Sequence, residues 1–115
     1  MSTDEELVNK EQIDNLKILF NHGFSDFIQT YFNDFESKEK LLVVAINANE
    51  LDNAKKIAHV LKGSSLNIGA TGLAKICAEI EEDCKLGKME EVLHGYQGLK
   101  EIYPKSKETY LRLTL

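Results

Sequence analysis

The stretch that decides the fold is residues 51–69, LDNAKKIAHVLKGSSLNIG. When these residues are placed on a helix at 100° per residue, Ile57, Leu61 and Ile68 fall on one side, among small residues. His59 points to the opposite side. Such a helix buries its apolar stripe against neighbouring helices and leaves the histidine in solvent.

Helical spacing of apolar residues continues over the rest of the chain, and strand signals are nearly absent, which predicts an all-α fold. We expect the helices in the following places: a short one over about 10–21, stopped by Gly23; a long one from Ser25, its N-cap, to Ala48; one over 51–68 closed by Gly69; one over 72–86 with Thr71 as its cap and Gly87 after it; and one from Met89 that Pro104 kinks or restarts.

Short connections between long amphipathic helices favour antiparallel neighbours. We therefore expect an antiparallel up-down four-helix bundle, with the short N-terminal helix covering one end. The 115 residues suit one domain, 1–115. The face of the second helix that we expect in the core carries Phe27, Ile28, Tyr31, Phe32, Phe35, Leu42, Ala45 and Ile46.

Composition and charge narrow the class of protein. The net charge is −5, which argues against nucleic acid or an anionic membrane surface as the partner. The longest apolar run, 41–46, is too short to span a bilayer, and the polar N-terminus has no signal-peptide pattern. Cys77 and Cys84 lie roughly 10 Å apart on one helix, too far for a disulfide. We expect reduced thiols and a cytoplasmic protein.

The neighbours of His59 indicate what this histidine does. Lys62 and Gly63 follow it by three and four residues, so both border its side chain on a helix. An imidazole is a nucleophile near neutral pH, and an ammonium offsets the charge of a phosphoryl group. Glycine inside a helix costs up to about 1 kcal/mol relative to alanine, which suggests that another molecule approaches the backbone there. The pattern predicts an exposed phosphoryl acceptor.

Other functions of this histidine are less well supported. Asp52 is the only acidic residue on the same face, and the lysines would oppose a cation, so we expect no metal site. The chain contains no P-loop or other nucleotide-binding motif, so we expect no cofactor and no transfer from ATP. The protein would be a phosphocarrier rather than an enzyme. Without Lys62 and Gly63, an inert surface histidine would be the better interpretation.

The string His59-Val60-Leu61-Lys62-Gly63-Ser64-Ser65 is followed by Gly69-Ala70 and by a helix that carries Leu73, Cys77, Ile80 and Glu81. This pattern resembles the signature of histidine-containing phosphotransfer (HPt) domains. The core of the resemblance covers about residues 54–87, and the number and order of the helices extend it more weakly over nearly the whole chain.

The resemblance implies a phosphorelay intermediate of two-component signalling. His59 would accept a phosphoryl group on Nε2 from the phospho-aspartate of one receiver domain and pass it to another. Lys62 would contact the phosphoryl group and Gly63 would leave room for the receiver, which alone would bring Mg²⁺. The partners would be response-regulator receiver domains and a hybrid sensor histidine kinase, and the simplest state is a free-standing monomer. The expected docking residues beside Gly63 are Lys55, Lys56, Leu66 and Asn67.

One position departs from the family pattern. Some relatives carry a glutamine on the neighbouring helix within reach of the histidine, where this chain has Glu81. A carboxylate would orient the imidazole but repel a phosphoryl group, so we leave Glu81 outside the expected site. Two alternatives stay open: a helical adaptor that binds a partner through the same face without phosphate, and, more weakly, the dimerisation domain of a kinase.

Overall fold

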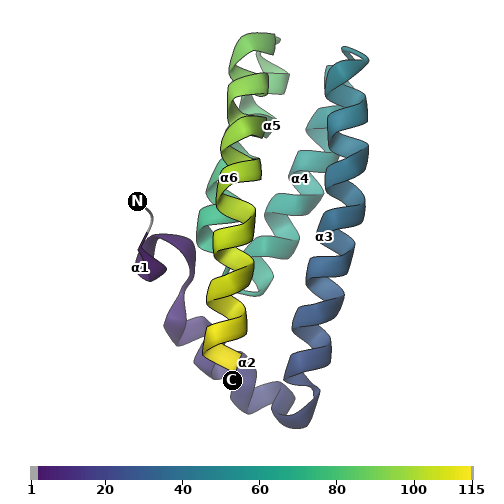
Figure 1. Cartoon of the computed structure of the whole chain (residues 1–115). Coiled ribbons are helices and arrows are strands. Elements are labelled where there is room, and N and C mark those ends of the chain that lie inside the picture. Colours follow the sequence, from purple (N-terminus) through teal and green to yellow (C-terminus); the bar gives the residue numbers. More distant parts are fainter. Residues whose placement is uncertain (1–2, 115) are drawn as a thin grey trace.

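The computed structural model describes residues 3–114, which form helices joined by short turns. Four long helices stand side by side and alternate in direction, with a shorter helix at the lower end of the bundle (Figure 1). This arrangement confirms the all-α bundle. None of the described helices is long and apolar enough to cross a membrane. The elements are α1 (Asp4–Leu7), α2 (Lys10–Phe20), the 3₁₀ turn η1 (Asn21–Gly23), α3 (Phe24–Asn47), α4 (Leu51–Asn67), α5 (Thr71–Lys85) and α6 (Met89–Thr114).

The turns between the bundle helices share one design. Each contains a residue with a positive φ: Asn49 (58°), Gly69 (81°) or Gly87 (70°). The next residue donates its N–H to a carbonyl five residues back, and its own carbonyl accepts the first hydrogen bond of the following helix. The residues in this double role are Glu50, Ala70 and Lys88. The chain therefore reverses within a few residues, which makes consecutive helices antiparallel.

The ends of the preceding helical segments explain why two expected N-caps are wrong. Thr71 is the first helical residue of α5, because Ala70 already occupies the N-cap position as the residue that closes the turn. Ser25 lies inside α3, which begins at Phe24 directly after η1 with Gly23 as its N-cap. In both places the end of the preceding helical segment sets the start of the next one, and a capping side chain is not needed.

Pro104 does not restart the last helix, since α6 continues from Met89 to Thr114 with the proline inside it. Proline removes one backbone hydrogen bond, the one to the carbonyl four residues earlier, on Lys100. Both residues are exposed, so solvent replaces the lost bond. The restart that the sequence left open is therefore wrong.

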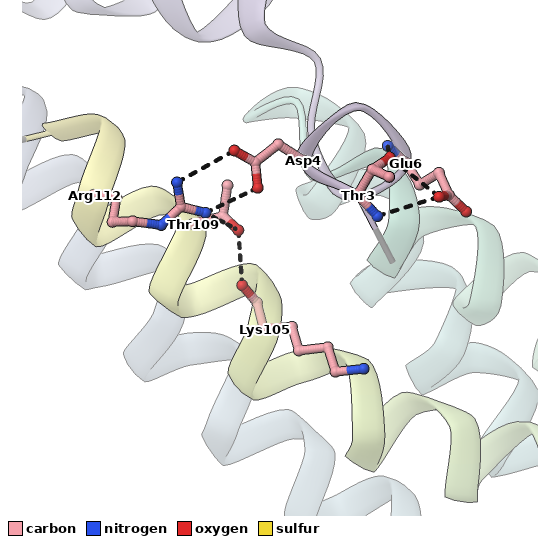
Figure 2. A network of polar contacts seen from close by, with 6 residues as sticks. All are labelled: Thr3, Asp4, Glu6, Lys105, Thr109 and Arg112. Carbon is pink, nitrogen blue, oxygen red and sulfur yellow. Dashed lines mark hydrogen bonds and ion pairs between the residues drawn. The ribbon is translucent and has the colours of Figure 1, made fainter. Parts of the chain in front are cut away.

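The one-turn helix α1 was not expected from the sequence. The Thr3 hydroxyl accepts the Glu6 N–H at 3.3 Å, and the Glu6 carboxylate accepts the Thr3 N–H at 3.2 Å, a reciprocal capping box (Figure 2). The Arg112 guanidinium donates to both oxygens of Asp4, at 2.8 and 3.2 Å. With Leu7 buried, these contacts hold α1 against the C-terminal half of α6.

The core lies along the inner faces of α3 to α6, as the apolar stripes predict. All the expected core residues of α3 are buried except Phe27, which is half-buried and stacks on Phe20 with ring centroids 4.3 Å apart. Cys77 and Cys84 are both buried free thiols, which agrees with the prediction of no disulfide. Burial raises the pKa of the Cys77 thiol to about 12, so it is uncharged near neutral pH.

The C-terminal end of α4 is anchored by other parts of the chain. Four consecutive carbonyls, those of residues 66–69, accept hydrogen bonds from outside the helix. The donors are the Gln12 side-chain amide, to Leu66 and Asn67 at 2.7 and 3.1 Å; the Tyr110 hydroxyl, to Ile68; and the Asn9 N–H, to Gly69 at 2.8 Å. Helix termini leave such carbonyls without intrahelical partners, so these contacts fix the position of α4.

The turn between α2 and α3 contains a strained residue. Asn21 has φ 49° and ψ −117°, a conformation that favours glycine, whereas Asn49 has φ 58° in the left-handed region that asparagine tolerates. We expect Asn21→Gly to raise the free energy of unfolding by about 1 kcal/mol and the melting temperature by about 4 °C. Thermal denaturation followed by circular dichroism measures this, with Asn49→Gly as the control that changes stability less. An unchanged or lower melting temperature for Asn21→Gly would show that Asn21 is not strained.

Candidate functional site

His59 lies in the middle of α4 and faces solvent, as the helical spacing predicts. Its side chain is 65% exposed, whereas Ala54 and Leu61 on the opposite side of the helix are fully buried. Ser65 is also buried on that side, and its hydroxyl pairs with the Tyr31 hydroxyl at 2.6 Å. The buried face therefore sets the rotation of α4 and keeps the imidazole at the surface.

Glu81 of α5 holds one nitrogen of this imidazole. Its Oε2 lies 2.8 Å from Nδ1 of His59. An ionised carboxylate can only accept a hydrogen bond, so Nδ1 must carry the proton. In the neutral ring the lone pair is then on Nε2, on the side of the ring away from Glu81. The contact thus presents Nε2 as the nucleophilic atom.

Lys62 contacts the same carboxylate. Its Nζ lies 2.7 Å from Oε1 of Glu81, which is buried. The Lys62 ammonium is the largest cause that lowers the pKa of Glu81, and the hydrogen bond from His59 adds to it, against the opposing effect of burial. The carboxylate is therefore ionised near neutral pH. One anion on α5 joins the two residues of α4 that the sequence singled out.

We left Glu81 outside the expected site, but its carboxylate contacts both His59 and Lys62. The family resemblance placed Glu81 within reach of His59, but it did not show that one carboxylate contacts both His59 and Lys62. The signal for this contact in the sequence is a glutamate on α5, the helix that follows the one with His59 and Lys62. We set Glu81 aside because we expected its carboxylate to repel a phosphoryl group. In the structure, the ammonium of Lys62 neutralises this carboxylate.

Gly63 borders His59 on α4, and the fold itself does not require a glycine there. A Cβ atom built at Gly63 meets nothing within 4 Å. At Gly72, by contrast, it would lie 2.9 Å from the Glu6 carbonyl oxygen, and at Gly95 it would lie 2.9 Å from Ile80. Those two glycines permit close packing inside the protein. Gly63 leaves open space at the surface beside the imidazole.

The remaining residues that the sequence singled out surround this centre on α4. Leu66 is half exposed, and Lys56 and Asn67 are exposed. Asn67 borders a groove of about 280 Å³ between α3 and α4, on the side of α4 away from Glu81. Lys55 is partly buried. Val60, which we had not singled out, adds a second exposed apolar side chain.

The described residues do not form a cluster that resembles a metal centre. Among residues 3–114, no group of three or more His, Cys, Asp or Glu side chains lies close enough to share a metal ion. The side chains gathered at this site are the exposed imidazole, the carboxylate that orients it and the ammonium that pairs with this carboxylate.

Solved structures of two proteins are similar to this chain. Histidine-containing phosphotransfer protein B from Pseudomonas aeruginosa PAO1 matches with a TM-score of 0.87 and 21% identity, over 91% of each chain. A rice protein assigned to the histidine-containing phosphotransfer proteins matches with a TM-score of 0.82 and 22% identity, over 97% of this chain and 86% of its own. At these identities the similarity establishes the fold. A search of curated proteins found no match.

The sequence also matches a family model, and this match identifies the family. The model of the Hpt domain covers residues 24–107, which include α4, α5 and the centre formed by His59, Lys62 and Glu81. The match spans well over half of the chain. The chain belongs to the Hpt domain family and is a phosphorelay intermediate of two-component signalling.

Proposed function

We propose that His59 is the residue on which this protein carries the phosphoryl group, with Nε2 as the phosphorylated atom. The observation that supports this proposal is the hydrogen bond from Nδ1 to Glu81, which leaves the lone pair of Nε2 free on an exposed ring. A neutral imidazole with this proton placement is a nucleophile near neutral pH. The other histidines, His22 and His94, lack a comparable pair of neighbours.

In the proposed transfer, the receiver domain approaches α4 over Gly63. The lone pair of Nε2 forms a bond to phosphorus while the bond from phosphorus to the aspartate oxygen breaks, and its electron pair stays on the aspartate carboxylate. Lys62 has a flexible stem, and its ammonium is paired with the same carboxylate that holds the ring, so it is the proposed contact to the phosphoryl oxygens. The receiver supplies Mg²⁺, and this chain supplies no cofactor.

The proposed docking surface is the exposed side of α4 on both sides of Gly63. Leu66 and Val60 offer apolar contacts, and Lys55, Lys56 and Asn67 surround them with polar groups. An apolar centre with a polar rim is the usual composition of a specific interface. Because these residues lie on one rigid helix, little of the surface needs to rearrange when a receiver binds.

The proposed role also indicates the partners of the protein, its assembly state and its location. Receiver domains are the partners of an Hpt domain, and we propose that a hybrid sensor histidine kinase carries the receiver that donates the phosphoryl group. The protein is a carrier rather than an enzyme, and we propose that it has no ATP site of its own. We further propose a single domain over 1–115 that acts as a monomer in the cytoplasm.

Of two tests of this proposal, the first concerns His59 itself. Its side chain is largely exposed, so His59→Gln should fold like the wild type, within about 0.5 kcal/mol. It should accept no phosphoryl group, since glutamine offers no nucleophilic ring nitrogen. The measurement is incubation with a phosphorylated receiver domain, followed by detection of label that is acid-labile but stable to base. His94→Gln is the matched control and should be labelled like the wild type.

Each result of this labelling experiment has a clear meaning. Label on His59→Gln that survives base would show that another histidine is phosphorylated. An absence of label on the wild type with every receiver from the same cell would contradict the carrier function. It would favour the phosphate-independent adaptor, which would bind partners through the same face of α4.

The second prediction concerns the open space at Gly63. Gly63→Ala should raise the free energy of unfolding by about 1 kcal/mol because alanine favours the helix. Gly63→Gln should also leave the fold intact but slow transfer from a receiver by at least about tenfold, since its side chain separates the reacting atoms. Stability is measured by denaturant unfolding and transfer by rapid-quench kinetics.

The control for Gly63 is Gly98 of α6, where a Cβ meets only Ile76, at 3.9 Å. Gly98→Gln should leave the transfer rate unchanged. If Gly63→Gln transferred at the wild-type rate, the receiver would not approach the helix over this residue.

A further inference from the structure

The carboxylate of Glu81 lies between two groups of α4 and is mostly shielded from solvent. It is 2.8 Å from Nδ1 of His59 and 2.7 Å from Nζ of Lys62, and its side chain is 24% exposed. The lowered pKa of Glu81 keeps it ionised near neutral pH. An amide at this position would accept the same hydrogen bond from Nδ1 but would carry no charge. The charge therefore needs an explanation of its own.

The charge matters most after His59 has been phosphorylated. When Nε2 uses its lone pair to bind phosphorus while Nδ1 keeps its proton, the ring becomes a cation. On release to a receiver aspartate or to water, an oxygen of the acceptor forms a bond to phosphorus while the bond from phosphorus to Nε2 breaks, and the electron pair of that bond returns to Nε2. The leaving group is then a neutral imidazole that still carries the Nδ1 proton. If Nδ1 had lost this proton, the leaving group would be an imidazolate anion, which leaves far less readily.

We propose that Glu81 is a positioning residue that keeps the proton on Nδ1 throughout the transfer cycle and so makes the phosphohistidine of this protein a fast phosphoryl donor. The proposal rests on the function proposed above for His59. An anion in contact with Nδ1 stabilises the cationic ring, and partial burial reduces the screening of this attraction. No proton has to move to or from the ring in either direction of transfer.

The same charge also acts on the phosphoryl group. Glu81 repels it across the ring, and this repulsion favours release as well. Lys62 limits the effect, because its ammonium neutralises the other oxygen of the carboxylate. The site therefore combines an anion that promotes departure of the phosphoryl group with a cation that keeps the phosphorylated state accessible.

The ionisable groups that surround this centre are few. Among residues 3–114, Lys62 and His59, both on α4, are the groups that shift the pKa of Glu81. One turn further along α5, the Cys84 thiol is close to the charges of Asp83 and Lys55, and its pKa is raised by burial. Because the pKa of Glu81 is lowered, its carboxylate stays ionised between pH 6 and 9. The pH dependence of the phosphohistidine lifetime over this range therefore reports on the phosphorylated ring.

The test compares the lifetime of phosphohistidine in the wild type and in Glu81→Gln. Phosphoramidate, a small phosphoryl donor, loads the imidazole without a receiver, and ³¹P NMR follows the loss of the phosphoryl group to water. We expect a lifetime about tenfold longer for Glu81→Gln at pH 8, because loss of the anion reduces the protonated fraction of the ring by about that factor. The two lifetimes should approach each other as the pH falls, because protonation of the ring then depends less on the anion beside it.

Two further variants separate this role from simpler ones. Glu82→Gln changes the net charge equally at an exposed neighbouring position of α5, and its lifetime should stay within about twofold of the wild type. Glu81→Gln also frees Lys62, so the comparison is repeated in the Lys62→Met background. The lengthening should persist there. If it vanished, the effect of Glu81 would act through Lys62, and the proposal would be wrong.

The unphosphorylated protein gives an independent readout. The ¹⁵N chemical shifts of His59 in the wild type should show the proton on Nδ1, and Glu81→Ala should shift the ring toward the tautomer with the proton on Nε2. A wild-type ring protonated on Nε2, or equal phosphohistidine lifetimes for the wild type and Glu81→Gln, would overturn the proposal. If the lifetimes differ but the loaded protein transfers to no receiver, the role of Glu81 stands and the carrier function fails.

Discussion

Hydrogen bonds that anchor the C-terminal end of α4 fix the position of the helix that carries His59. Its last carbonyls accept hydrogen bonds from the start of the chain and from α6, while its buried face packs against the core. A helix held at its end and along one face can neither slide nor rotate freely. The exposed side of α4, with His59 at its centre, therefore has a fixed position relative to α5.

Much of the fold could be predicted from the sequence, because apolar residues at helical spacing report directly on which face is buried. The glycines at 69 and 87 marked two of the three tight turns, since a positive φ favours glycine. The third turn uses Asn49, which tolerates the same backbone conformation but occurs in many other settings. The starts of α3 and α5 could not be predicted from cap residues, because hydrogen bonds of the preceding turn decided them.

The candidate site was predictable to a different degree. Spacing on a single helix placed His59, Lys62 and Gly63 on one exposed side, and this needs only the geometry of that helix. The role of Glu81 depends on how α5 packs against α4 and on which side-chain conformations bring one carboxylate to two partners. Neither is encoded in a local pattern. Contacts between helices decide the chemistry that spacing within a helix leaves open.

The proposed phosphoryl acceptor, His59, lies on a helix rather than on a loop, and this placement has a physical consequence. A loop must be ordered when a partner binds, and that ordering reduces the affinity. His59 is already oriented by Glu81, and the backbone beneath it is held by regular hydrogen bonds and by the turns at both ends of α4. In the proposed transfer, Lys62 is the side chain that has to move, because its ammonium is paired with Glu81 in the free protein. A small helical domain can thus serve successive receivers with one rigid surface, because the reacting nitrogen occupies the same place before each of them arrives.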